Sequence, residues 1–144
     1  MLYYEDMVPG ESVIGPALIV DLNEMREFAK DWDPLPQHID DEVGQEVFGS
    51  LTAPGLYILA LKQRLIHRME EKPAVIASFG YDQVRFHKAV RPNDSLTLNL
   101  EWIKRRLSKS RKEQGIVTVH FSLRNQDHDV VMSHLDTVLV RCRR

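Results

Sequence analysis

Apolar and polar residues alternate over long stretches in the second half of the chain. Strict alternation is typical of a β-strand that buries one face and exposes the other. The pattern predicts strands over residues 96–102 and 117–123, and a less regular strand over residues 130–140. Between residues 75–79 and the next apolar pair the alternation changes parity at Gly80, which predicts a β-bulge there.

Short turn sequences separate these strands. Arg91–Asp94 contains proline and asparagine, and Asn125–Asp129 forms the next polar cluster. Strands joined by short turns pair antiparallel, so the later strands are expected to form one antiparallel sheet. Residues 12–20 predict an earlier strand, in which Gly15 and Pro16 indicate an edge position or a bend.

Three helical segments are predicted between the first strand and the later ones. The first helix begins at Asp21, a good N-cap with Glu24 three residues later as in a capping box. It is expected to end near Trp32, because two prolines follow closely and disfavour helical backbone before them. Asp40 or Asp41 is expected to cap a second, short helix.

The third helix, over residues 54–69, is apolar on every side in its first turns. A helix that is apolar all round is a buried one, which places this segment at the centre of the domain. Its polar residues Lys62, Gln63, Arg64 and Arg68 are predicted to mark where the helix reaches solvent.

This order of elements predicts the α+β class, with a curved antiparallel β-sheet wrapped around a long central α-helix. It is the element order of the hotdog fold. The chain has 144 residues with no internal repeat or long linker, so we expect a single domain over residues 1–144.

The composition, 43% apolar and 28% charged, is that of a soluble globular protein. No apolar run is long enough to span a membrane, and no secretory signal is visible at the N-terminus. Cys142 is the single cysteine, which excludes an internal disulfide and a CxxC zinc site. We therefore expect a cytoplasmic protein.

The net charge of −2 is unevenly distributed. Residues 1–48 contain 12 acidic and 2 basic side chains, whereas residues 49–144 contain 9 acidic and 17 basic ones. The densest basic stretch includes Lys104, Arg106 and Lys109. We hypothesise that these three bind phosphates of a ligand, although a solvated hairpin is the simpler interpretation. Nucleic acid is not expected as a partner, since no aromatic residues interleave with the basic ones.

Candidate chemistry lies between the first and third helices. Asp33 and His38 are five residues apart across two prolines, and a proline-stiffened loop is expected to bring both side chains over one cavity. An imidazole that takes or returns a proton and a carboxylate that orients a water suit a hydration or dehydration step. Gly55, preceded by Pro54, starts the buried helix, where its unpaired N–H can stabilise a developing oxyanion.

Purely structural roles for these residues stay open. Asp33 and His38 could belong to a capped surface loop, and Gly55 could be a packing glycine. The acidic residues near the histidine suggest a metal site by residue type, but a solvated acidic loop is the favoured interpretation. Those acidic residues are Asp31, Asp33, Asp40 and Asp41.

The segments DPLPQHID, residues 33–40, and FGSLTAPG, residues 48–55, resemble the signature of the MaoC-like dehydratases. This hotdog family includes the (R)-specific enoyl-CoA hydratases. Its motif is an Asp, then a His five residues later with a proline two positions before it, then a stretch of small residues that ends in Gly at a helix start. Asp33, His38 and Gly55 match that motif.

The resemblance implies a hydratase or dehydratase that adds water reversibly to a trans-2-enoyl thioester. Asp33 and His38 would hold the water, and the Gly55 N–H would stabilise the enolate-like oxygen. Coenzyme A or an acyl carrier would bring the substrate, with no metal or other cofactor and no membrane partner. The resemblance also implies a homodimer or higher homo-oligomer. Leu35 and Pro54 would lie against the substrate, where the family has polar residues.

Two alternatives to this function stay open. A hotdog thioesterase commonly places an acid on or beside the central helix, whereas residues 55–69 contain no Asp or Glu. With Leu35 and Pro54 in place of polar residues, the domain could also bind acyl-CoA, or pair with a catalytic subunit, without turnover.

Overall fold

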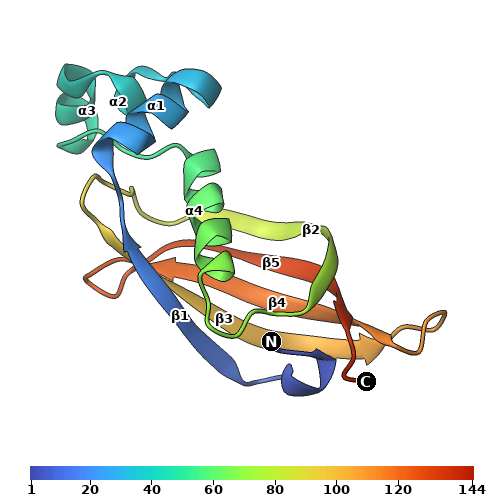
Figure 1. The fold of residues 1–144 in the computed structure, drawn as a ribbon. Coiled ribbons are helices and arrows are strands. Elements are labelled where there is room, and N and C mark those ends of the chain that lie inside the picture. Colours follow the sequence, from blue (N-terminus) through green and yellow to red (C-terminus); the bar gives the residue numbers. More distant parts are fainter.

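Five antiparallel strands form one sheet in the order β1-β3-β4-β5-β2 (Figure 1). The structure is a computed structural model that describes all residues, 1–144. β3, β4 and β5 follow one another as hairpins, and β1 and β2 form the two edges. The strands are β1 (Ser12–Ile19), β2 (Val75–Phe86), β3 (Ser95–Leu107), β4 (Gln114–Arg124) and β5 (Val130–Arg141).

One long helix crosses the concave face of the sheet, and three shorter helices cap one end of the molecule (Figure 1). This arrangement confirms the predicted α+β architecture. The helices are the short 3-10 helix η1 (Tyr4–Asp6), α1 (Leu22–Trp32), α2 (Pro36–Ile39), α3 (Asp41–Phe48) and the central α4 (Gly55–His67).

The core lies between α4 and the alternating residues of β3 and β4. These strand residues are almost completely buried, as the alternation predicted, and they pack with Tyr57, Ile58, Leu61 and Leu65 of α4. The apolar positions of the alternating pattern therefore identify the side of each strand that faces the central helix. The buried strand residues are Leu96, Leu98, Leu100, Trp102, Val117, Val119, Phe121 and Leu123.

The predicted irregularities in the strands are present. The β2–β5 register shifts between Ser78 and Gly80, where Gly80 has a φ of 141° that favours glycine. A second shift in β2, around Gln83, was not predicted. β1 is an edge strand, and its register is irregular across Gly15–Pro16 as expected.

The first helix begins as predicted, but the capping box is only half formed. The Asp21 side chain accepts a hydrogen bond from the Glu24 N–H at 2.8 Å. The Glu24 carboxylate instead accepts hydrogen bonds from Arg64 and Tyr57, each at 2.7 Å, which lower its pKa. Glu24 thereby joins α1 to the central helix.

The segment between the prolines is not the simple loop that was expected. Pro36 is the first residue of α2, a single helical turn that contains His38. Proline is well tolerated there because the first residue of a helix has no intrahelical use for its N–H. The prolines therefore both end α1 and begin α2.

The expectation that Lys62 reaches solvent is wrong. Its side chain is fully buried, and its Nζ lies 3.1 Å from the Tyr81 hydroxyl on β2. Gln63 and Arg64, which follow it in α4, are exposed as predicted. Partners on distant strands, which local sequence does not reveal, allow the lysine to be buried.

Candidate active site

Asp33 and His38 are positioned by the junction between α1 and α2. Asp33 is the C-cap of α1, and its N–H donates to the Ala29 carbonyl at 2.9 Å. Pro34 then prevents the helix from continuing, and Leu35 is extended, with φ −65° and ψ 142°. The chain therefore reverses within a few residues and returns His38 toward Asp33.

The two side chains face each other. His38 Nε2 lies 3.8 Å from Asp33 Oδ2, and the side chains are 11% and 34% exposed. That separation is too long for a direct hydrogen bond. It allows one water or hydroxyl group to be held by both.

The backbone fixes the tautomer of His38. Its Nδ1 lies 2.7 Å from the Thr52 carbonyl oxygen. A carbonyl oxygen can only accept, so Nδ1 carries the proton and donates it. Nε2 of the neutral ring therefore presents its lone pair toward Asp33, which is the arrangement of a general base.

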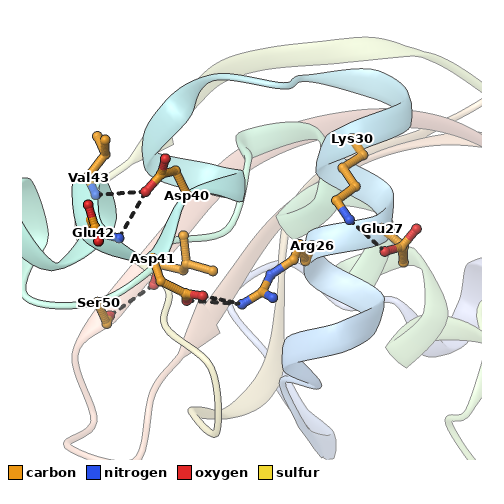
Figure 2. A network of polar contacts seen from close by, with 9 residues as sticks. Arg26, Glu27, Lys30, Asp40, Asp41, Glu42, Val43 and Ser50 are labelled. Carbon is orange, nitrogen blue, oxygen red and sulfur yellow. Dashed lines mark hydrogen bonds and ion pairs between the residues drawn. The ribbon is translucent and has the colours of Figure 1, made fainter.

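Figure 2 shows a polar network that joins the short helices α1 and α3. Asp40 caps α3 by accepting from the N–H groups of Glu42 and Val43, at 2.9 and 3.2 Å. Arg26 of α1 lies 3.0 Å from Asp41. Two of the acidic residues that suggested a metal by residue type thus have structural roles.

Gly55 is the first residue of α4, and its N–H donates to no protein acceptor. It follows Thr52 by three residues, so it lies within about 11 Å along the chain of the carbonyl that binds His38. A Cβ atom at Gly55 would lie 2.7 Å from the Phe86 ring, so that with the ring in this place only glycine fits. The N–H stands at the positive end of the helix dipole and can bind a developing anion.

The other predicted binding residues lie in different places. Pro54 is buried as the N-cap of α4, and Leu35 is exposed beside α2. Lys104, Arg106 and Lys109 are exposed on the β3–β4 hairpin, at the end of the sheet away from the short helices (Figure 1). Lys104 follows Ser95, the first residue of β3, by nine residues, which corresponds to about 30 Å along the strand. The structure does not bring these basic residues to the candidate pair within one chain.

Sequence reasoning missed Thr52, whose backbone carbonyl orients His38. No sequence signal marks it, because any residue type carries a carbonyl. It also missed the polar residues His134 and Asp136, which are buried on the inner face of β5. The available signal was that they share a face of the strand with the apolar residues Met132, Val138 and Val140, at intervals of two residues.

The sequence profile described as "MaoC like domain" matches residues 6–123. The chain belongs to the MaoC-like domain family. The uncharacterized protein YdeM of Bacillus subtilis is 29% identical over 127 residues, which cover 87% of this chain and 89% of YdeM.

Solved structures resemble the whole MaoC-like domain. The MaoC-like dehydratase from Rhodospirillum rubrum has a TM-score of 0.91 at 28% identity, covering 100% of this chain and 99% of that one. The R-hydratase PhaJ1 from Pseudomonas aeruginosa shares the fold, with a TM-score of 0.77 at 20% identity and coverage of 98% and 86%.

These comparisons confirm the resemblance and the hotdog fold predicted from the order of elements. A MaoC-like dehydratase is among the structures similar to this chain, and R-hydratases share its fold. No helix in this MaoC-like domain combines the length and apolar character needed to cross a membrane.

Proposed function

We propose that this MaoC-like domain adds water to the double bond of an enoyl thioester, and catalyses the reverse dehydration. The observation that carries the proposal is the orientation of His38, whose Nδ1 is held by a backbone carbonyl while Nε2 faces Asp33. Family membership supports the reaction class.

The proposed reaction uses the three candidate groups in turn. His38 Nε2 removes a proton from the water that Asp33 orients, and the water oxygen forms a bond to the β-carbon of the thioester. The electrons of the double bond move toward the carbonyl oxygen, where the Gly55 N–H stabilises the negative charge. The proton then passes from the Asp33–His38 pair to the α-carbon, and the carbonyl double bond re-forms.

The substrate is proposed to be an enoyl-CoA, or the equivalent thioester of an acyl carrier, with coenzyme A as its carrier and no separate cofactor. Pro54 and Leu35 are proposed to contact it. The assignment of Lys104, Arg106 and Lys109 to the carrier phosphates rests on charge alone. Reversing all three charges should raise the Michaelis constant for the enoyl-CoA, and an unaltered constant would remove them from the site.

A homodimer is proposed from the exposure of β2. This strand ends the sheet, so its outer backbone groups are unpaired, and several of its apolar side chains are exposed. Such an edge is a template for pairing with another chain. Because Phe86 of β2 contacts Gly55, a second copy along β2 would lie beside the proposed site.

The test is the hydration of crotonyl-CoA, which is measured by the loss of its absorbance. Asp33→Asn and His38→Asn are each expected to lower kcat/KM by about 100-fold to 10,000-fold, because each removes a proton-transfer group. The amide nitrogen of asparagine takes the position of the histidine Nδ1 and can still donate to the Thr52 carbonyl, so the local fold should persist. Asp31→Asn and His128→Asn, which change exposed residues of the same types, are the matched controls.

Unchanged rates in both site variants would exclude the proposed mechanism. A free-thiol assay on the same samples tests the thioesterase alternative, which the absence of acidic residues in α4 disfavours. Calorimetric binding of an enoyl-CoA without turnover would instead support the non-catalytic alternative.

A further inference from the structure

The interior between α4 and the far half of the sheet contains a buried cation. Lys62 is fully buried, and its Nζ donates to the Tyr81 hydroxyl at 3.1 Å and to Gln63 Oε1 at 3.4 Å. The same Nζ lies 4.4 Å from the centre of the Tyr81 ring and 5.1 Å from that of Phe121. Burial lowers the pKa of Lys62 to about 8. A buried lysine is costly to a fold, so its retention calls for a physical reason.

β5 supplies two polar partners from its inner face. Asp136 accepts a hydrogen bond from the Ser78 hydroxyl at 2.5 Å, and burial raises its pKa. His134 stacks on the Tyr81 ring at 4.3 Å, and its buried Nε2 has no hydrogen-bond partner. Burial lowers the pKa of His134 to about 4, so the ring is neutral near pH 7.

A cavity of about 420 Å³ adjoins this cluster. Its wall includes Tyr81, Ser78 and Asp136 beside the apolar Phe121 and Val138. A pocket for a hydrocarbon chain gains nothing from such polar groups, since each must give up water without a new partner. The wall is therefore suited to a group that forms hydrogen bonds.

The free hydrogen-bonding capacity of the wall is specific. The Tyr81 oxygen accepts from Lys62, and its own hydrogen is free to be donated. One Asp136 oxygen accepts from Ser78, and the other accepts no hydrogen bond from the protein. Tyr81 and Asp136 thus offer one donor and one acceptor, beside the exposed polar residues Gln63, His67 and Lys72 that also line the cavity. The opposite charges of the buried Lys62 and Asp136 balance, and Lys72 is exposed to solvent, so this inner cluster favours an uncharged ligand group.

The cavity adjoins the C-terminal half of α4, where Gln63, Ile66 and His67 line it. Lys62 follows Gly55 by seven residues, which places it on the same side of the helix about 10 Å further along. An acyl chain whose carbonyl binds the Gly55 N–H can therefore extend along this face toward Tyr81 and Asp136.

We infer that the acyl group of the substrate carries an uncharged group that both donates and accepts hydrogen bonds, such as a hydroxyl, and that Tyr81 and Asp136 bind it. This inference rests on the proposed function. Lys62 is a positioning residue, because its Nζ donates to the Tyr81 oxygen. The hydroxyl hydrogen of Tyr81 therefore points away from Lys62 and is available to the ligand. The polar group distinguishes this substrate from an unsubstituted fatty acyl chain.

The experiment compares three trans-2-enoyl-CoA substrates of about ten carbons, a length chosen for the ~10 Å along the helix. They end in a methyl, a hydroxyl or a carboxylate group. The wild-type domain should hydrate the hydroxyl-ended substrate with a kcat/KM about 10-fold above that of the methyl-ended one, which is the effect expected of hydrogen bonds to Tyr81 and Asp136.

Tyr81→Phe removes only the hydroxyl, so the ratio of the two kcat/KM values should fall toward one. Lys62→Met should lower the ratio in the same direction. Tyr57→Phe is the matched control, since the Tyr57 hydroxyl bonds to Glu24, and it should leave the ratio unchanged.

Three results would overturn the inference alone: a wild-type preference for the methyl-ended substrate, a preference for the carboxylate, or an unchanged ratio in Tyr81→Phe. In each of these the domain still hydrates enoyl-CoA, so the proposed function stands. If no substrate is hydrated at all, the proposed function fails and the inference fails with it.

Discussion

At the scale of single residues, Gly55 tests whether the backbone itself takes part in the reaction. A Cβ atom there would lie 2.7 Å from the Phe86 ring. The ring is half exposed and can move, so Gly55→Ala should fold with little change in Tm. We expect kcat/KM for crotonyl-CoA to fall about 100-fold, as when one oxyanion donor is lost, because the methyl group and the displaced ring crowd the N–H.

The double variant Gly55→Ala/Phe86→Ala separates crowding by the ring from crowding by the methyl group. If the displaced ring blocks the N–H, the double variant should have a higher kcat/KM than Gly55→Ala. Phe86→Ala alone is the control for the effect of removing the ring. Full activity in Gly55→Ala would show that this N–H plays no part in the reaction.

The residues of the candidate pair were predictable, but their support was not. The spacing of Asp33 and His38 across two prolines was compatible with a shared site and with a capped surface loop, and Gly55 and the order of elements favoured the shared site. The anchor of His38 is a carbonyl fourteen residues away. Backbone groups have no identity in a sequence, so neither this hydrogen bond nor the resulting tautomer could be predicted.

At the scale of elements, α4 shows both the strength and the limit of pattern analysis. Its apolar character correctly placed it at the centre of the sheet. Lys62 lies seven residues after Gly55 and four after the buried Ile58, hence within the buried stripe. Its charge nonetheless predicted exposure, because its partners Tyr81 and Asp136 are far away in the sequence.

Replacement of Lys62 by methionine should stabilise the domain at pH 7. The pKa of Lys62 falls from 10.5 to about 8 on folding, chiefly through burial, although Asp136 opposes the shift. The folded state therefore carries an unfavourable ammonium below pH 8, at a cost of up to about 3 kcal/mol. Methionine has similar length and no charge, so Lys62→Met should raise the free energy of unfolding by about 1–3 kcal/mol.

The pH dependence gives this prediction a distinct signature. Between about pH 8 and 10.5 the unfolded chain binds more protons at this lysine than the folded one, so the contribution of Lys62 to wild-type stability should become less unfavourable as the pH rises. The advantage of Lys62→Met should therefore shrink over that window in urea unfolding. Lys72→Met, at an exposed lysine, should show neither effect. A variant less stable than the wild type at pH 7 would mean that Lys62 stabilises the fold.

At the scale of the whole molecule, the sequence predicts local pairing better than distant pairing. The hairpins β3–β4 and β4–β5 follow from short turns between alternating segments. The placement of β1 beside β3 and β2 beside β5 joins segments that are far apart in the chain. Only the resemblance to a known fold made that part of the sheet order predictable, because periodicity does not identify the partner of a strand.

Periodicity likewise does not identify what covers the outer edge of β2. Several apolar side chains of this strand are exposed, and no element of this chain covers them. Phe79 is 61% exposed and Ile76 is 41% exposed, on a strand with an unpaired edge. A stable interface between two copies needs about 1,000 Å² of buried surface, which an edge of twelve residues can supply only in part. The neighbouring exposed Leu56 of α4 extends the apolar area toward the proposed site.

We therefore expect sedimentation equilibrium at micromolar concentration to give a dimer, and Phe79→Lys to give a monomer of intact fold. A lysine on an edge strand opposes pairing, since it places like charges together at the junction of two copies. Ile14→Lys on β1, the other edge, changes a side chain that is 77% exposed and should leave the dimer intact. If β2 of one copy closes the site of the other, Phe79→Lys should also lose hydratase activity while Ile14→Lys keeps it. A monomeric wild type, or a dimeric Phe79→Lys, would exclude β2 as the interface.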